Sequence, residues 1–416
     1  MSVLLIAANT ERMNMVPLPY GLGLVAAALR QAGHEVAFLD LMDSPDPAGA
    51  VRQAIQRARP ELIGISIRNI DDQNQQEPRF LLEKVREVMA ACRESCAAPV
   101  VLGGPGYSIF PRAALDYLGA DYGIRGDGEG ALPALLDCLR RGQDPGRIPG
   151  VQAAGAEADA APAAVPDLDR LPAWDAARER TGPLEDFWMP VQSRRGCPND
   201  CSYCATASIQ GRNLRFRSPR RVVEVIAGLA AKGYRRFFFV DNSFNIPERT
   251  AFELCRGLRD LRPPVQWRCI LYPQAVREDL VRAMAAAGCV EVSLGFESGS
   301  PAILREMNKR YTPEEVRQTA DLLGRHGIRR MGFLLLGGPG ETRETVEESL
   351  AFARSLGLES LRVTVGIRIY PGTALAQRAL REGVIDSEAD LLFPSFYLAP
   401  GLAPWIHDRV RAEGLP

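Results

Sequence analysis

Short apolar runs alternate with helical patterns over the first third of the chain. The runs are rich in Val, Ile and Leu and show little alternation with polar residues, so both faces of each are expected to be buried, as in a parallel sheet covered by helices. Residues 1–145 are therefore predicted to form a doubly wound, flavodoxin-like α/β domain whose ligand lies beyond the carboxyl ends of the strands. The predicted strands are 2–8, 35–41, 61–67, 98–104 and 120–124.

Residues 146–188 interrupt this alternation. The segment is rich in Ala, Pro and Asp and has no clean period. Such a composition predicts a linker that wraps between two domains. A small hairpin over 151–156, followed by a Pro-rich crossover, is an equally good interpretation.

The alternation of strand and helix patterns resumes over residues 189–385. Six βα units predict a partial (β/α)6 barrel, three-quarters of the eight-stranded one, with its functional residues at the carboxyl ends of the strands. Residues 386–416 are predicted to form a C-terminal tail that is mostly irregular and aromatic. The predicted barrel strands are 189–194, 236–241, 266–271, 291–296, 331–337 and 360–367.

The charges of the 416 residues nearly cancel, with 50 Lys+Arg against 51 Asp+Glu. This balance predicts no nucleic-acid partner, because nucleic-acid surfaces are usually basic. Only Lys84, Lys232 and Lys309 are lysines, which we attribute to genomic base composition. No apolar run is long enough to span a membrane, and the first residues do not resemble a secretory signal, so a cytoplasmic protein is expected.

Nine cysteines in a cytoplasmic protein point to metal binding or catalysis for some of them, since thiols stay reduced there. Cys197, Cys201 and Cys204 lie within eight residues, just past the first predicted barrel strand. Zinc sites usually take four ligands, and no nearby Cys or His supplies a fourth. Three thiolates on a four-iron cluster would leave one iron open for another ligand. A loop of structural cysteines and a zinc site completed by a distant Cys are the alternatives, and the six other cysteines are expected to pack in the core.

The C-x3-C-x2-C spacing, with Tyr203 before the last Cys, resembles the signature of the radical S-adenosylmethionine (SAM) enzymes. The resemblance implies a [4Fe-4S] cluster held by the three cysteines and SAM bound at the open iron. It also implies SAM contacts at successive strand ends, where 240–245 resembles the Asp-x-x-Phe variant of the second-strand motif, and an acid at the fourth strand end suits the ribose hydroxyls. The implied SAM-contacting residues are Tyr203, Asp241, Ser243, Glu297, Ser298, Leu335 and Tyr370.

Segments 19–23, 33–36, 103–105 and 125–129 resemble the cobalamin-binding domain that precedes the barrel in cobalamin-dependent radical SAM enzymes. The Asp-x-His-x-x-Gly motif is absent, which implies cobalamin with no His on cobalt. The implied cobalamin contacts are Arg68, Gly103, Gly104, Gly126 and Glu129. Ordinary tight turns could equally explain the glycines, and a salt bridge from Arg68 to Asp71 or Asp72 is the alternative for that arginine.

The resemblance as a whole implies an enzyme that methylates an unactivated carbon of a small, natural-product or lipid-like substrate. It implies an electron donor such as flavodoxin or ferredoxin. One alternative is a cobalamin-dependent cyclase, ring-rearranging or oxidising enzyme without methyl transfer. Another is a radical SAM enzyme whose N-terminal domain no longer binds cobalamin. The alternative outside enzymes is an iron–sulfur electron carrier or a zinc-stabilised binding protein.

Overall fold

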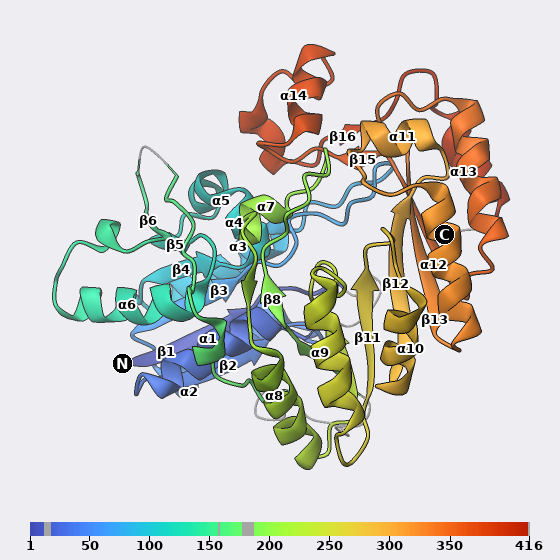
Figure 1. Cartoon of the computed structure of the whole chain (residues 1–416). Coiled ribbons are helices and arrows are strands. Elements are labelled where there is room, and N and C mark those ends of the chain that lie inside the picture. The colour runs from blue at the N-terminus through green and yellow to red at the C-terminus, as the bar shows by residue number, and fades with distance from the viewer. Residues whose placement is uncertain (12–17, 157–158, 177–186, 415–416) are drawn as a thin grey trace.

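The computed structural model describes residues 1–11, 18–156, 159–176 and 187–414. Two units built on parallel sheets lie side by side, with the N-terminal unit and the barrel-like unit joined by a segment that runs along both (Figure 1). This confirms the predicted α/β class.

In the described part of the N-terminal unit, six strands form one sheet in the order β2-β1-β3-β4-β5-β6. The first five are parallel, and their order is that of the predicted flavodoxin-like fold. β6 is antiparallel to β5. The strands are β1 Ser2–Ala7, β2 Glu35–Asp40, β3 Leu62–Ser66, β4 Val100–Gly103, β5 Tyr122–Ile124 and β6 Val151–Ala153.

Both faces of this sheet are covered by helices, which explains the continuous apolar runs of its strands. In β1, Val3 and Leu5 join the apolar cluster of α1 and α6, whereas Leu4 and Ile6 join that of α2 and α3. The helices are α1 Tyr20–Gln31, α2 Pro47–Ala58, α3 Leu82–Ser95, α4 Pro105–Ile109, α5 Pro111–Leu118 and α6 Gly128–Arg140.

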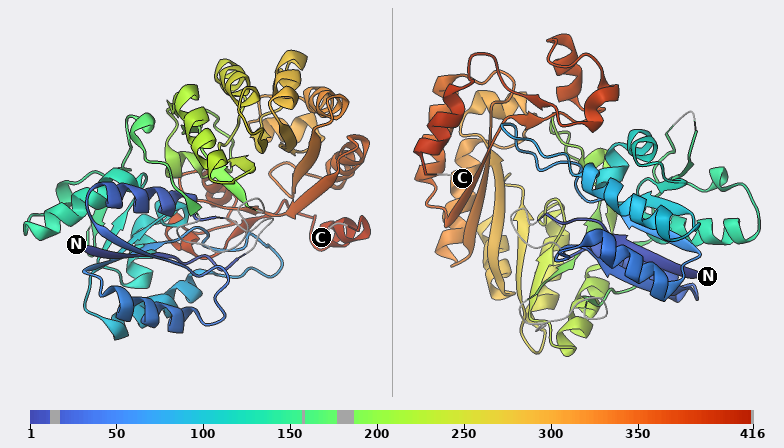
Figure 2. Two further views of the ribbon diagram at one scale, coloured as in Figure 1. Left: turned by 90° about the horizontal axis from the view of Figure 1, so that it is seen from below. Right: turned by 180° about the vertical axis from the view of Figure 1, so that it is seen from behind.

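The second unit has an open parallel sheet in the order β7-β10-β11-β12-β13-β14, counting the described residues. Helices line its outer side, and the N-terminal unit lies on the other side (Figure 2). Its strands are β7 Trp188–Val191, β10 Arg236–Phe239, β11 Gln266–Leu271, β12 Cys289–Glu297, β13 Arg329–Leu336 and β14 Ser360–Val365. Its helices are α8 Pro219–Ala231, α9 Glu248–Arg259, α10 Glu278–Ala286, α11 Pro301–Glu306, α12 Pro313–Arg325 and α13 Arg343–Ser355.

Local sequence signals start several of these helices. Thr312 and Thr342 each accept a hydrogen bond from the backbone three residues on, and the residue there bonds back, which completes a capping box at α12 and α13. Ser218 caps α8 in front of a proline, whose fixed φ suits a first helical turn.

The linker region adds a strand to the N-terminal sheet. The predicted hairpin over 151–156 is wrong, because β6 pairs with β5. Downstream, Trp174 packs on Tyr20 with ring centroids 6.2 Å apart and lies against Gly23, so the segment wraps over the N-terminal unit. Residues 157–158 and 177–186 of this region lie outside the described residues.

The predicted tail is less irregular than expected, because about half of its described residues lie in a 3-10 helix (Glu388–Leu392), in β16 Phe396–Tyr397 and in α15 Trp405–Ala412. β16 pairs antiparallel with β15 Ile367–Arg368, and α14 Ala374–Arg381 lies between the two strands in sequence. The helix α15 buries Ile406 and Val410, which lie four residues apart on one face. This pair was hidden in a segment dominated by prolines and aromatic residues. In the described chain, none of the helices has the length and apolar character needed to cross a membrane.

Candidate active site

The three clustered cysteines lie on the loop between β8 (Arg194–Arg195) and α7 (Thr206–Gln210). Cys197, Cys201 and Cys204 are half-buried free thiols. Of the other six, only Cys96 is half-buried, which agrees with the packing role predicted for them. The fully buried ones are Cys92, Cys138, Cys255, Cys269 and Cys289.

Backbone hydrogen bonds fix this cysteine loop on three sides. Gly196 has a φ of 91°, and a Cβ there would overlap the carbonyl oxygen of Asn213, so only glycine fits before the first cysteine. The Cys197 N–H donates to the Gly211 carbonyl at 3.1 Å. Ser202 donates to Met307 at 3.1 Å and accepts from the Leu375 N–H at 2.8 Å.

The donor set of the loop suits an iron–sulfur cluster. In the part of the chain that the structure describes, no three Cys, His, Asp or Glu side chains converge on a point that could hold a single metal ion. A four-iron cluster needs a different arrangement, because each thiolate binds a separate iron. Three thiols on one anchored loop meet that need, and thiolate is the ligand that such clusters prefer.

Lys309 is the functional residue of this site that the sequence analysis missed. Its ammonium lies 3.2 Å from Glu297 and 5.1 Å from the centre of the Tyr203 ring. The Lys309 and Glu297 side chains are only 6% and 14% exposed. Burial alone would lower the pKa of Lys309, but Glu297 together with Tyr203, Tyr311 and Cys201 raises that pKa well above its ordinary value. Burial raises the pKa of the Cys201 thiol, and Lys309 opposes the shift.

Glu297 ends β12 in a strained backbone conformation. Its φ is 61°, and the pairing of β12 with β13 shifts register between Gly295 and Glu297. Such strain persists where surrounding contacts enforce it, often at functional sites. Here the Tyr311 hydroxyl bonds the Gly295 carbonyl at 2.8 Å, and Lys309 holds the carboxylate. Glu297 thus faces the cysteine loop from the fourth strand end, the place where the sequence predicts a ribose contact.

Asp241 is engaged by the protein itself. Its carboxylate accepts from the Ser193 N–H at 2.9 Å, the Ser193 hydroxyl at 2.5 Å and the Arg194 N–H at 3.2 Å. Burial raises its pKa, and these donors oppose the shift. Asp241 therefore fixes the chain that leads to Cys197, and its contact with SAM stays a prediction.

The remaining predicted SAM contacts differ in how open they are. Ser243 bonds the Asn242 carbonyl at 2.8 Å, and Ser298 bonds Ser349 at 2.9 Å, so both hydroxyls have partners within the protein. Leu335 is half-buried on β13. The Tyr370 hydroxyl accepts a hydrogen bond from Gln73 of the N-terminal unit at 3.1 Å. Burial raises the pKa of Tyr370 to about 12.

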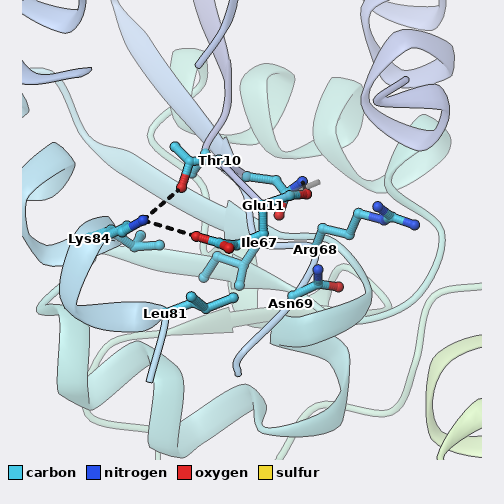
Figure 3. Close-up of a pocket in the computed structure, with 10 residues that line it drawn as sticks. Thr10, Glu11, Ile67, Arg68, Asn69, Leu81 and Lys84 are labelled. Carbon is cyan, nitrogen blue, oxygen red and sulfur yellow. Dashed lines mark hydrogen bonds and ion pairs between the residues drawn. The ribbon is translucent and has the colours of Figure 1, made fainter. Parts of the chain in front are cut away.

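A pocket lies in the N-terminal unit where the strand order reverses, after β1 and β3 (Figure 3). Ligands of doubly wound sheets bind at such a switch point. Lys84 reaches Glu11 at 2.9 Å and Thr10 at 3.4 Å, so a second of the three lysines lies in a candidate site. The lining residues are Ala8, Asn9, Thr10, Glu11, Ile67, Arg68, Asn69, Leu81, Lys84 and Val85.

Arg68 follows β3 and points away from Lys84 and Glu11 (Figure 3). The alternative salt bridge from Arg68 is wrong, because Asp71 pairs with Arg368 and Asp72 with Arg79. Loss of solvation by the surrounding protein atoms lowers the pKa of Arg68. The Asn69 side-chain nitrogen beside it is buried without a hydrogen-bond partner among the described residues. A cation and an unused amide donor suit a polar ligand such as the corrin ring with its amide groups.

The predicted glycine contacts divide into two kinds. At Gly104, with φ 95°, a Cβ would overlap the Ile67 backbone, and at Gly126, with φ 88°, it would overlap Ala163. Glycine is therefore required at positions 104 and 126 by the local course of the backbone, without a ligand. At Gly103 the nearest atom to a Cβ is the Ile124 carbonyl oxygen, 3.8 Å away, which leaves room beside the strand end.

Buried ion pairs join the cysteine loop to the N-terminal unit. Arg195, two residues before Cys197, reaches Asp127 at 2.9 Å and Glu129 at 2.6 Å, at the N-terminus of α6. Arg215 also pairs with Asp127. Glu129, predicted to contact cobalamin, is therefore engaged by Arg195, and that predicted contact remains untested. α4 of the N-terminal unit packs on α7 beside the cysteine loop.

Comparisons with known proteins bear on this pair of sites. The radical SAM superfamily matches residues 191–353, and the B12 binding domain matches residues 10–136. The chain is a radical SAM protein with a B12-binding domain. The cysteine loop lies in the first match, and the switch-point pocket lies almost wholly in the second. The predicted [4Fe-4S] cluster, SAM and cobalamin are thereby confirmed as its cofactors.

Radical SAM relatives align with this chain over most of its length. The tryptophan 2-C-methyltransferase of Streptomyces laurentii is 27% identical, over 89% of this chain and 73% of the relative. The anaerobic magnesium-protoporphyrin IX monomethyl ester cyclase of Rubrivivax gelatinosus is 28% identical, over 81% of this chain and 62% of the relative.

A solved structure of this radical SAM class has the same two-unit fold. The radical SAM methyltransferase TsrM of Kitasatospora setae, solved with tryptophan and a SAM analogue, matches with a TM-score of 0.86 and 26% identity, over 98% of this chain and 87% of that chain. Another structure of TsrM contains cobalamin and a [4Fe-4S] cluster. The prediction of an enzyme is confirmed, and the electron-carrier and binding-protein alternatives lose their support.

Proposed function

We propose that this radical SAM protein is a cobalamin-dependent methyltransferase that methylates a carbon atom of a small molecule. The observation that carries the proposal is the junction of two sites. The loop of three cysteines is tied to the N-terminal unit, which carries the switch-point pocket, by Arg195, which pairs with Asp127 and Glu129. A methyl donor in one unit and a radical source in the other need two units that are packed together in this way.

The chain supplies ligands, charge and exclusion of water. When bound, the cluster supplies the electron that cleaves SAM, and cobalamin carries the methyl group. Cys197, Cys201 and Cys204 would hold the cluster. Lys309 fixes the position of the Glu297 side chain, which suits a carboxylate that accepts hydrogen bonds from ribose hydroxyls.

Arg68 and Asn69 would hold cobalamin from the N-terminal unit, and the cobalamin would supply the methyl group. The acids nearest to Arg68 in sequence, Asp71 and Asp72, pair with Arg368 and Arg79, so they do not neutralise its charge. No histidine lines the pocket, so its lining offers no imidazole to cobalt.

The partner and the compartment are also proposed. The cluster needs one-electron reduction, for which a flavodoxin or ferredoxin is the expected donor. The cytoplasm is the expected compartment, because all nine cysteines, each in a described segment, are free thiols and three are needed reduced.

The test is anaerobic reconstitution with iron, sulfide and hydroxocobalamin, followed by SAM carrying a labelled methyl group. Tryptophan is the first substrate to try, because one relative is a tryptophan 2-C-methyltransferase and TsrM was solved with tryptophan bound. We expect labelled product together with S-adenosylhomocysteine, and no product from Cys201→Ala. The Rubrivivax relative motivates a second candidate, a cyclase. Deoxyadenosine without S-adenosylhomocysteine, in the presence of a consumed substrate, would favour the cyclase and overturn methyl transfer.

A further inference from the structure

Arg194 is a buried cation whose charge nothing in the described chain compensates by contact. The residue is 3% exposed. All three nitrogen atoms of its guanidinium are buried without a hydrogen-bond partner among the described residues. Burying a charge without a counter-ion costs on the order of several kcal/mol of folding free energy. The working protein is therefore expected to supply a partner for the Arg194 guanidinium.

The acids nearest in the fold make no hydrogen bond to this guanidinium, although the buried Asp241 carboxylate acts on its charge at longer range. Arg195 follows Arg194 on β8, and successive strand residues point to opposite faces. The Arg195 side chain forms ion pairs with Asp127 and Glu129, so the Arg194 side chain points away from these two acids. Asp241 bonds the backbone N–H of Arg194, while its oxygens are shared with Ser193.

The position of Arg194 points to the cysteine loop. It lies three residues before Cys197 on a chain fixed by Asp241. Burial lowers the pKa of Arg194, while Asp241 and then Cys197 act in the opposite direction. A four-iron cluster on three thiolates is negatively charged, and its sulfur atoms accept N–H donors.

We propose that Arg194 is the countercharge of the [4Fe-4S] cluster, donating N–H groups toward its sulfur atoms and raising its reduction potential. This inference rests on the cluster site of the proposed function. A fixed positive charge stabilises the reduced cluster more than the oxidised one, because reduction adds a negative charge. Arg194 is thus a positioning and electrostatic residue, and it touches no substrate.

The experiment measures the midpoint potential of the reconstituted cluster, without SAM, by potentiometric titration in Arg194→Met, Arg194→Lys and the control Arg212→Met. Arg212 is an exposed arginine of the same loop region. For Arg194→Met we expect the equilibrium constant of one-electron reduction to fall about tenfold, equal to about 59 mV for one electron. Arg194→Lys keeps the charge and should retain most of the potential, and Arg212→Met should retain all of it.

A second measurement needs no cluster. In the cluster-free protein, Arg194→Met removes an unpaired buried charge and should raise the melting temperature. A lower melting temperature would mean that the protein already pairs Arg194, which would overturn the proposal.

The outcomes separate this inference from the proposed function. A wild-type protein that binds no cluster defeats the proposed function. A wild-type cluster whose potential is unchanged in Arg194→Met defeats the role of Arg194 alone. If SAM affinity, measured by equilibrium dialysis, falls in that variant while the potential stays constant, Arg194 binds a ligand carboxylate and the countercharge role is wrong.

Discussion

Glu341, in the loop after β13, is a buried acid with hydrogen-bond partners on only one of its two carboxylate oxygens. The N–H groups of Gly337 and Gly338 donate to one carboxylate oxygen, and the other oxygen is buried without a partner among the described residues. Burial raises its pKa to about 7, against these two hydrogen bonds. Near neutral pH this one side chain thus makes the fold sensitive to proton concentration.

Glu341→Gln should remove that sensitivity. The folded pKa of about 7 lies above the ordinary value of 4.5, so between these values the folded protein holds an extra proton. The stabilising contribution is full below about pH 4.5, declines as pH rises and is lost above 7, an effect on the order of 3 kcal/mol. Urea unfolding should find the variant equal to wild type at pH 4 and more stable at pH 8. The exposed Glu344→Gln is the control, and identical pH profiles for wild type and Glu341→Gln would contradict the argument.

At the scale of elements, the cysteine loop depends on one sharp turn. Gly196 and Gly211 both have positive φ, 91° and 80°, but only Gly196 has a neighbouring backbone atom where a Cβ would lie. Gly211 meets nothing within 4 Å. The pair therefore separates the effect of steric overlap from that of backbone strain.

Gly196→Ala is expected to lose most of the cluster, because the added methyl group forces Cys197 away from its bond to Gly211. Gly211→Ala carries only the backbone strain, about 1–3 kcal/mol because its φ of 80° and ψ of 170° lie in a region adopted almost only by glycine, and should keep cluster binding. Iron and sulfide content per chain after anaerobic reconstitution gives the answer. Equal iron loading in the two variants would show that the overlap at Asn213 is unimportant.

Much of the element order could be predicted because it is encoded locally. Buried strands appear as short apolar runs, and each capping residue lies beside its helix. β6 was missed because its pairing with β5 depends on a distant strand. Lys309 was missed because its partner Glu297 is twelve residues away and its burial comes from tertiary packing; the scarcity of lysine was the available signal. Arg194 resembles any other arginine until its surroundings are known.

At the scale of the whole molecule, the segment after Arg68 reaches across to the C-terminal region. Asp71 pairs with Arg368 at 2.6 Å, with both side chains 3% exposed or less. Arg368 also donates to the carbonyls of Ile369 and Leu391. This buried network joins the units at a second place, apart from Arg195.

Asp71→Asn should destabilise the protein by about 3–5 kcal/mol, since it leaves Arg368 buried without a counter-ion. The double variant with Arg368→Met should recover much of the loss, because it removes the stranded charge. Glu94→Gln breaks the exposed pair with Arg52 and should cost about 1 kcal/mol or less. Denaturant midpoints for the four proteins measure these differences, and a loss at Asp71→Asn no larger than at Glu94→Gln would refute the burial argument.

The crossing segment continues beyond Asp71. Gln73 bonds Tyr370, and Gln75 bonds His407 of α15 at 2.8 Å while filling the space over Gly366. Its matching surfaces are scattered along the last fifty residues of the chain, far from the boundary between the two sequence matches. A hybrid enzyme could take its first half from one relative and its second half from another. Its crossing segment and its C-terminal region would then come from different proteins, and their contact residues would not be complementary. If residues 69–80 and 366–410 are taken from the same relative, the contacts between the crossing segment and the C-terminal region are kept.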